Sequence, residues 1–165
     1  MGRLYLGNQE VTPILYDKEA SIGLPREVSS QGVYGYPAQN FSFSLPSDAK
    51  NVGSYALYYA FYNCSSLTSV NLSSLTTVSV SGAFNGAFQH CSSLTSVSFP
   101  ALATITGSSA FNGAFQYCSN LTSMSFPALT TSSFGSRTNQ FNNMLYGCTG
   151  VTVHFPSAIQ STIGS

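Results

Sequence analysis

Hydrophobic side chains return at fixed positions over most of this chain, as members of a repeat. Residues 60–86, 87–113 and 114–143 align with one another, the third block being slightly longer, and a degenerate fourth block begins at Met144. One cysteine marks the same position in each block: Cys64, Cys91, Cys118 and Cys148. Repetition at a period of roughly 20–50 residues is typical of solenoids, whose coils bury their apolar faces only against their neighbours.

Each block contains two local patterns. The segment Ala-Phe-x-x-Cys-x-x-Leu spaces apolar residues at i, i+3 or i+4 and i+7, which predicts a short helical turn. The following Thr-Ser-Val-Ser-Phe alternates with a period of two, which predicts a short strand, and a proline then ends that strand. The apolar positions of three successive coils should form a shared core: Phe61, Cys64, Leu67, Val70, Phe88, Cys91, Leu94, Val97, Phe115, Cys118, Leu121 and Met124.

Between the apolar positions of each predicted strand lie small polar residues. If the coils stack in register, these residues point outward and form parallel rows: Ser69, Asn71, Ser96, Ser98, Ser123 and Ser125. Such a face is uncharged and rich in hydrogen-bond donors and acceptors, which suits contact with a protein or a glycan. The alternative is that Ser and Thr only keep a spacer hydrated. Solenoids present extended faces to their partners, which favours the binding interpretation.

The repeated motif also points to a family. The pattern Cys-x-x-Leu-x-x-Val-x-Phe-Pro, preceded by Ala-Phe-x-x, resembles the BspA-like leucine-rich repeats of bacterial surface proteins, over roughly residues 40–165. The resemblance implies an α/β-type repeat solenoid with short parallel strands and short helical turns, about 27 residues per coil. It further implies adhesion or host-protein binding and no enzyme activity. Val151, in a leucine position, and the longer third block depart from the pattern near the last coil.

Residues 1–39 do not repeat. The stretch from Leu4 to Val11 alternates around Gly7-Asn8, which predicts a small hairpin. We assign 1–39 as an N-terminal cap or docking segment and 40–165 as the leucine-rich-repeat solenoid. A cap would cover the open edge of the first coil, whereas a dock would join a larger assembly. As a dock, the segment is similar to the short opening strands of modular phage tail and bacterial surface proteins.

The distribution of charge narrows the choice of partners. Charged residues make up 6% of the chain, five basic against five acidic, and only Arg137 lies beyond residue 50. We therefore expect no nucleic-acid binding, because phosphate contacts need a basic patch. We also expect no membrane insertion, since no apolar run has the length of a span. The first residues lack the apolar core of a signal peptide. A net charge near zero predicts self-association through the open C-terminal coil.

Catalytic and metal-binding patterns are weak. His90 and His154 are the only histidines, and both aspartates lie before residue 50, so no Ser–His–Asp arrangement is predicted. The cluster 17–19 (Asp-Lys-Glu) fits a solvated loop better than a Ca²⁺ site. Each cysteine is solitary in its repeat, which fits a buried thiol better than a zinc site or a disulfide. We expect neither enzyme activity nor a metal or other cofactor.

Three functions remain from the sequence. The first is a recognition or adhesion module on a cell surface, secreted or on a virion, which binds a protein or surface carbohydrate. The second is a structural spacer or assembly component of a surface fibre or phage tail. The third is a surface-ordering protein such as an ice binder, suggested only by the Ser/Thr rows. Tyr58, Tyr59, Tyr62 and Tyr117 are expected either to anchor a partner or to pack between coils.

Overall fold

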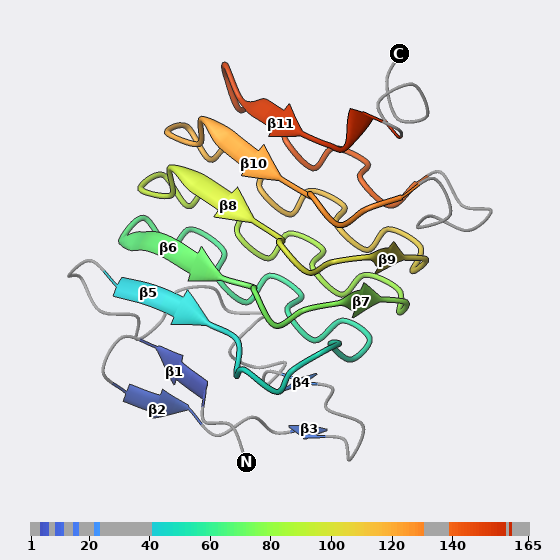
Figure 1. The fold of residues 1–165 in the computed structure, drawn as a ribbon. Helices are drawn as coiled ribbons and strands as arrows, with labels where there is room; N and C mark the ends of the chain where they lie inside the picture. Colours follow the sequence, from blue (N-terminus) through green and yellow to red (C-terminus); the bar gives the residue numbers. More distant parts are fainter. Residues whose placement is uncertain are drawn as a thin grey trace.

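The computed structural model describes residues 4–6, 9–11, 15–16, 22–23, 41–130, 139–157 and 159. In these residues the chain winds into a stack of coils, each contributing one strand to a row that runs up the molecule (Figure 1). The strands of that row are β5 (Phe41–Ser44), β6 (Leu67–Asn71), β8 (Ser96–Ser98), β10 (Ser123–Ser125) and β11 (Thr152–His154). The predicted short parallel strands are confirmed, because β5 pairs with β6, and β8, β10 and β11 pair in turn, all in parallel.

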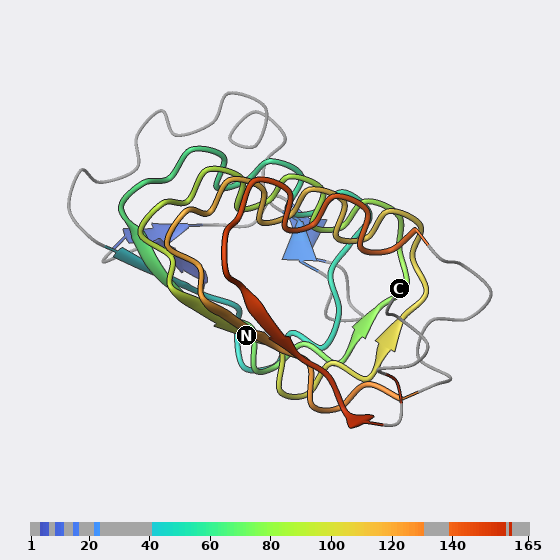
Figure 2. The ribbon, with the colours of Figure 1, turned by 90° about the horizontal axis from the view of Figure 1, so that it is seen from above.

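The register follows the sequence repeat. Ser123 of β10 pairs with Ser96 of β8, its equivalent in the preceding coil, and with Thr152 of β11 in the following coil. A second, shorter ladder joins β7 (Thr77–Val78) to β9 (Thr104–Ile105), again in parallel and between equivalent positions of the repeat. Seen along the stack, this ladder occupies one side of each coil, and a wavy row of turns lies on the side opposite the main strands (Figure 2).

The N-terminal segment meets the solenoid through backbone pairing. β1 (Leu4–Leu6) and β2 (Gln9–Val11) form an antiparallel hairpin, and β1 also pairs antiparallel with β5, the first strand of the stack. Two further short strands, β3 (Leu15–Tyr16) and β4 (Ile22–Gly23), pair with each other. The Asp-Lys-Glu cluster at 17–19 lies outside the described residues.

The predicted short helical turns are wrong: the described chain forms consecutive tight turns there instead. The backbone angle φ is positive at every fourth position in the first of these segments, at Tyr55, Tyr59 and Asn63, which a right-handed helix does not allow. Two kinds of backbone hydrogen bond alternate. Ala60 N donates to Leu57 O at 3.1 Å within the coil, and Phe61 N donates to Ala87 O at 2.8 Å in the next coil. The turns therefore form a ribbon that is hydrogen-bonded from coil to coil.

The sequence signal for this ribbon is a strict four-residue period. Residues 82–89 read Gly-Ala-Phe-Asn-Gly-Ala-Phe-Gln, with both Ala-Phe pairs buried. Steps of four residues drift about 40° around a helix with 3.6 residues per turn, so such pairs would leave the core face. Gly82 and Gly86 have φ of 60° and 61°, a conformation that glycine adopts without steric cost. The shared i, i+4 spacing explains why helix and turn ribbon look alike in sequence.

Columns of phenylalanine rings fill the centre of the stack. Phe88 stacks on Phe61 and Phe115 with ring centroids 5.3 and 5.1 Å apart, and Phe99 stacks on Phe126 at 4.8 Å. The residues expected to form the core are buried except Val70, which is half-buried: Phe61, Cys64, Leu67, Phe88, Cys91, Leu94, Val97, Phe115, Cys118, Leu121 and Met124. Offset ring stacking adds to the free energy gained from burial itself.

The cysteines are free thiols on the inner side of the turn ribbon. Cys91 Sγ donates to Phe61 O at 3.2 Å, Cys118 Sγ to Phe88 O at 3.1 Å and Cys148 Sγ to Phe115 O at 3.0 Å, each reaching back one coil. Burial raises the pKa of the Cys118 thiol to about 12. These thiols therefore stay protonated at neutral pH and link successive coils as weak hydrogen-bond donors.

Candidate binding surfaces

The outward side of the main strands carries the polar rows expected from the sequence. Ser69, Asn71, Ser96 and Ser98 are exposed, and Ser123 and Ser125 are half-buried. The register between β8 and β10 places Ser123 beside Ser96 and Ser125 beside Ser98. Strand β6, which carries Ser69 and Asn71, pairs with β5 in a separate sheet and lies next to β8 in the stack. Neighbouring strands in a sheet lie about 4.8 Å apart, so the side chains of one row lie within reach of their neighbours.

The structure lengthens both rows at each end. Ser42 and Ser44 of β5 pair with Ser69 and Asn71, and Thr152 and His154 of β11 pair with Ser123 and Ser125. We call the combined set the strand-face ladder: Ser42, Ser69, Ser96, Ser123 and Thr152 in one row, and Ser44, Asn71, Ser98, Ser125 and His154 in the other. The end residues could have been found from the sequence, since 41–46 and 151–156 share one alternating pattern ending in proline.

Hydrogen bonds engage some side chains of the strand-face ladder. Ser125 Oγ donates to Ser98 Oγ at 2.8 Å, and Asn71 Oδ1 accepts from Ser73 N at 3.0 Å. Each hydroxyl can both donate and accept, and the amide nitrogen of Asn71 carries two further donors. The face can therefore make many weak hydrogen bonds in parallel.

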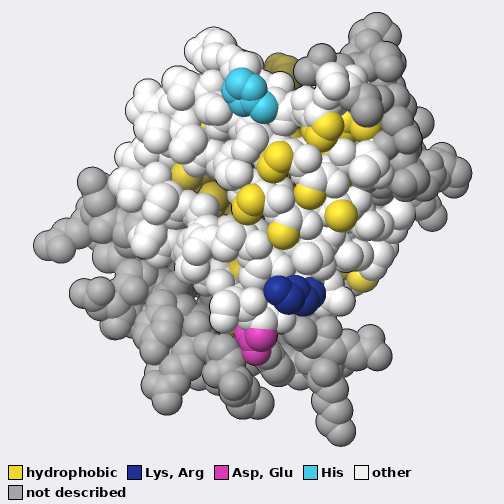
Figure 3. All heavy atoms as spheres, in the orientation of Figure 1, with side chains coloured by type: hydrophobic (Ala, Val, Ile, Leu, Met, Phe, Trp, Pro, Cys, Tyr) yellow, Lys and Arg dark blue, Asp and Glu magenta, His cyan; other side chains and the backbone are white. Residues whose placement is uncertain are grey.

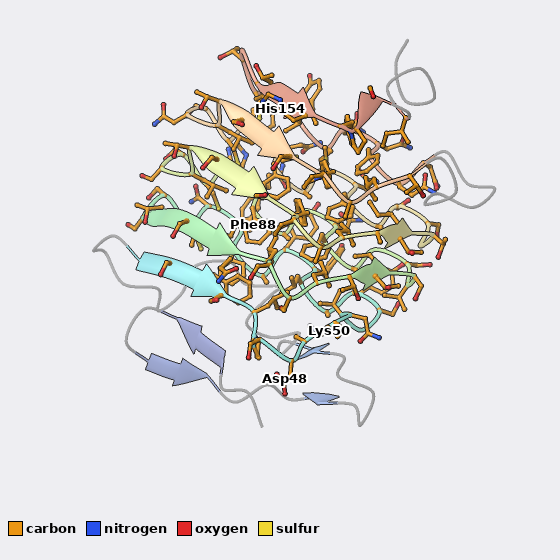
Figure 4. All side chains as sticks on the ribbon, viewed as in Figure 1. Asp48, Lys50, Phe88 and His154 are labelled. Atoms are coloured by element: carbon orange, nitrogen blue, oxygen red, sulfur yellow. The ribbon has the colours of Figure 1, made fainter. Side chains whose placement is uncertain are left out.

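The strand face is almost free of charge. In the space-filling view the face is mostly white, the colour of the backbone and of uncharged polar side chains, with some apolar side chains between them (Figure 3). Asp48 and Lys50 lie at the end of the stack near β5, and His154 lies at the other end on β11 (Figure 4). A partner bound between these ends must be recognised by hydrogen bonds and shape, since no formal charge faces it in described residues 51–130 and 139–157.

A second surface runs along the turn ribbon. The aromatic ridge, as we call it, comprises Tyr55, Tyr58, Tyr59, Tyr62, His90, Tyr117 and Tyr146. From coil to coil, ring centroids lie 5.6 Å apart for Tyr62 and His90, 4.7 Å for His90 and Tyr117, and 5.6 Å for Tyr117 and Tyr146. Of the four tyrosines singled out from the sequence, Tyr62 and Tyr117 are exposed and Tyr58 and Tyr59 are half-buried.

The Tyr59 phenol of the ridge is uncharged at physiological pH. Burial raises the pKa of the Tyr59 phenol above its ordinary value of 10.0, and the neighbouring Tyr58 and Tyr62 add to the shift. His90 contacts Tyr62 and Tyr117 through its ring. Gln89 and Gln116 precede His90 and Tyr117 in the sequence, and Gln89 Nε2 donates to Gln116 Oε1 of the next coil at 2.9 Å.

The described residues offer neither a metal site nor a membrane span. No group of three His, Cys, Asp or Glu side chains comes together there as a metal site would require. Across the same residues, no helix has the length and apolarity that crossing a membrane takes.

Comparison with known proteins agrees with the repeat pattern. No curated protein and no solved structure matches the chain. The BspA type leucine rich repeat region matches residues 42–164, in six copies. Repeats of this family usually mediate protein interaction or adhesion and typically carry no enzyme activity. The match begins at Ser42 in β5, extends past β11 and covers well over half of the sequence, and the chain therefore belongs to the BspA-type leucine-rich repeat family.

Proposed function

We propose that this solenoid is a non-enzymatic recognition or adhesion module that binds a protein or a surface glycan through its strand-face ladder. The alignment of small polar groups within two neighbouring parallel sheets carries the proposal: β5 with β6, and β8 with β10 and β11, present hydroxyl, amide and imidazole groups outward. A surface of this kind gains affinity from many weak contacts made together. Rigid coil-to-coil pairing lowers the entropy lost when these groups are ordered by a partner.

The family supports a place of action at a surface. BspA-type repeats are typically found on bacterial surface proteins, which supports a location at a cell surface for this chain. A secreted protein or a virion surface would expose the strand-face ladder to a partner in the same way. The partner would then be an extracellular protein or a carbohydrate displayed on a neighbouring cell.

The N-terminal segment acts as a cap in this proposal. Pairing of β1 with β5 occupies the edge of the first strand in the stack, which an uncapped solenoid would leave open. The last coil buries its apolar side chains less completely than the preceding coils do. Five of them are only half-buried against the core: Phe141, Leu145, Val151, Val153 and Phe155. These side chains support self-association at that end, which light scattering over a range of concentrations would detect as a rising mass.

The test is binding to an array of glycans and extracellular-matrix proteins, using the labelled protein and a Ser69→Lys, Ser96→Lys, Ser123→Lys variant. We expect a saturable interaction that the variant loses, because three lysines disrupt the flat neutral face. A Ser79→Lys, Ala103→Lys, Ser119→Lys variant carries the same added charge at exposed positions outside the ladder and should still bind. Absence of any saturable partner, or equal loss in both variants, would contradict the proposal.

A further inference from the structure

The aromatic ridge contains rings on backbone positions that large side chains seldom occupy. Tyr55, Tyr59, His90 and Tyr117 have φ of 55°, 50°, 62° and 56°, in the left-handed region. This conformation costs free energy for a residue with a Cβ, most of all for a bulky one. Costs of this kind are concentrated at functional sites, where the surrounding structure holds the residue in place.

The fold itself does not need rings at these positions. Neighbouring coils carry glycine, asparagine or serine at the equivalent left-handed positions: Asn63, Gly82, Gly86, Ser109, Gly113, Asn143 and Gly147. The coils around these residues have the same ribbon and the same coil-to-coil hydrogen bonds as the others. The aromatic side chains therefore serve something other than the formation of the ribbon.

Glycines in the next coil make room for the rings. A Cβ at Gly82 would collide with the ring of Tyr55, one at Gly86 with that of Tyr59, and one at Gly147 with that of Tyr117. Each ring thus lies on the backbone of the following coil. This support fixes the ring direction at the surface, so a ligand would meet a preorganised platform.

The rings remain open to solvent despite this support. Tyr55, Tyr62, Tyr117 and Tyr146 are 56%, 37%, 41% and 60% exposed, and they are all of the exposed large hydrophobic side chains among the described residues. Exposed apolar side chains that gather in one strip indicate an interaction site, whereas single exposed ones are common on any protein surface. The strip lies on the turn ribbon and is separate from the strand-face ladder.

The chemistry of the ridge selects a class of ligand. Aromatic rings pack against the C–H faces of sugar rings, and amide side chains hydrogen-bond to sugar hydroxyls. Both groups are present, since Gln89 and Gln116, which precede His90 and Tyr117 in the sequence, join their amides in a hydrogen bond between coils. A highly charged partner would find no opposite charge in described residues 51–130 and 139–157.

We propose that the aromatic ridge binds an uncharged linear polysaccharide. The rings recur from coil to coil at centroid distances of 4.7 to 5.6 Å along the stack, in alternating T-shaped and stacked orientations, so a chain of sugar rings laid along it meets one aromatic side chain after another. Individual contacts are weak and their sum gives the affinity. This inference goes beyond the function proposed for the strand face and does not depend on it.

The test is affinity electrophoresis of the full chain through gels containing hydroxyethylcellulose, dextran, xylan or glucomannan, each compared with a gel lacking polysaccharide. We expect retardation by at least one of them. Six of the ten tyrosines belong to the ridge and the chain has no tryptophan, so a change in tyrosine emission that a variant of the ridge lacks gives a second signal of binding at the ridge.

The variant Tyr59→Asn, Tyr117→Asn introduces the residue that Asn143 and Asn63 already provide at the equivalent positions, so it should fold. Its midpoint of thermal unfolding, followed by circular dichroism, checks this. We expect its affinity for the retarding polysaccharide to fall about tenfold or more, since two ring contacts are lost. The Ser69→Lys, Ser96→Lys, Ser123→Lys variant should be retarded like the wild type.

Several results would overturn the inference. They are no retardation in any of the four gels, unchanged affinity in the folded tyrosine variant, or loss of retardation only in the strand-face variant. A protein partner whose binding requires the tyrosines, without polysaccharide binding, would assign the ridge to protein recognition instead. The strand-face proposal is tested separately. It would be contradicted if the Ser69→Lys, Ser96→Lys, Ser123→Lys variant kept its binding on the array, or if no saturable partner were found there.

Discussion

Gly107 is the position where one missing side chain lets two coils approach most closely. A Cβ added there would collide with the carbonyl oxygen of Val80, in the preceding coil, and would lie 3.0 Å from its backbone nitrogen. The obstacle is backbone, so no side-chain rotation can remove it. Gly53 occupies the equivalent position one coil before Val80, yet a Cβ at Gly53 meets nothing within 4 Å. Gly107→Ala and Gly53→Ala therefore form a matched pair.

The magnitude follows from the local contacts. To admit the Cβ, the two coils must separate by on the order of 1 Å at this point. Thr106 N and Gly107 N both donate to Val78 O, at 3.0 and 3.2 Å, and both bonds would be weakened. Each bond contributes about 1 kcal/mol, and overpacking adds about 1–3 kcal/mol. In the opposite direction, replacing glycine by alanine stabilises the folded protein by about 0.4–1 kcal/mol, because it lowers the conformational entropy of the unfolded chain.

We therefore expect Gly107→Ala to lower the free energy of unfolding by about 2–4 kcal/mol. In a chain of this size the midpoint of thermal unfolding should fall by about 5–15 °C. Gly53→Ala should leave it unchanged or raise it slightly. Circular dichroism during urea and thermal unfolding measures both variants. If Gly107→Ala unfolds within about 0.5 kcal/mol of Gly53→Ala, the close approach of the coils does not constrain this position and the reasoning is refuted.

Further predictions concern the core and the thiols. Phe88→Ala removes a fully buried ring and should lower the free energy of unfolding in urea by about 3–5 kcal/mol, whereas Tyr146→Ala should change it by less than about 1 kcal/mol. In the native protein, Cys64 and Cys118 should react with a disulfide reagent at pH 8 about a hundredfold more slowly than in urea, and fast native labelling would contradict their burial. Burial raises the pKa of both thiols from 9.0 to about 12, so the unfolded chain releases these protons first. The stability that the thiols contribute should therefore be constant below about pH 9 and be lost between about pH 9 and pH 12. Cys64→Ala should make this loss of stability less steep. An unchanged slope would mean that the Cys64 thiol titrates normally in the folded state.

Sequence alone was sufficient to predict the repeat and much of its interior. A period of about 27 residues, with Phe, Cys and Leu at fixed positions, requires that equivalent residues stack, because a single coil cannot bury its own apolar face. Alternation in Thr-Ser-Val-Ser-Phe specified which side chains of the strands face outward, since successive residues of a strand point to opposite sides. The parallel strands and the family follow from these patterns. The polar rows of the strand face were predicted for the same reason.

The turn ribbon and the aromatic ridge, by contrast, depend on contacts between coils. Apolar residues four apart fit one side of a helix as well as a row of turns, so local pattern could not separate the two. Hydrogen bonds from Phe61 N to Ala87 O and from Phe88 N to Ala114 O select the turns, because they join residues of neighbouring coils. Ridge formation likewise depends on the next coil, where a glycine must lie beneath each ring of Tyr55 and Tyr59. Packing of one coil on another sets the backbone here, and a single repeat does not contain that information.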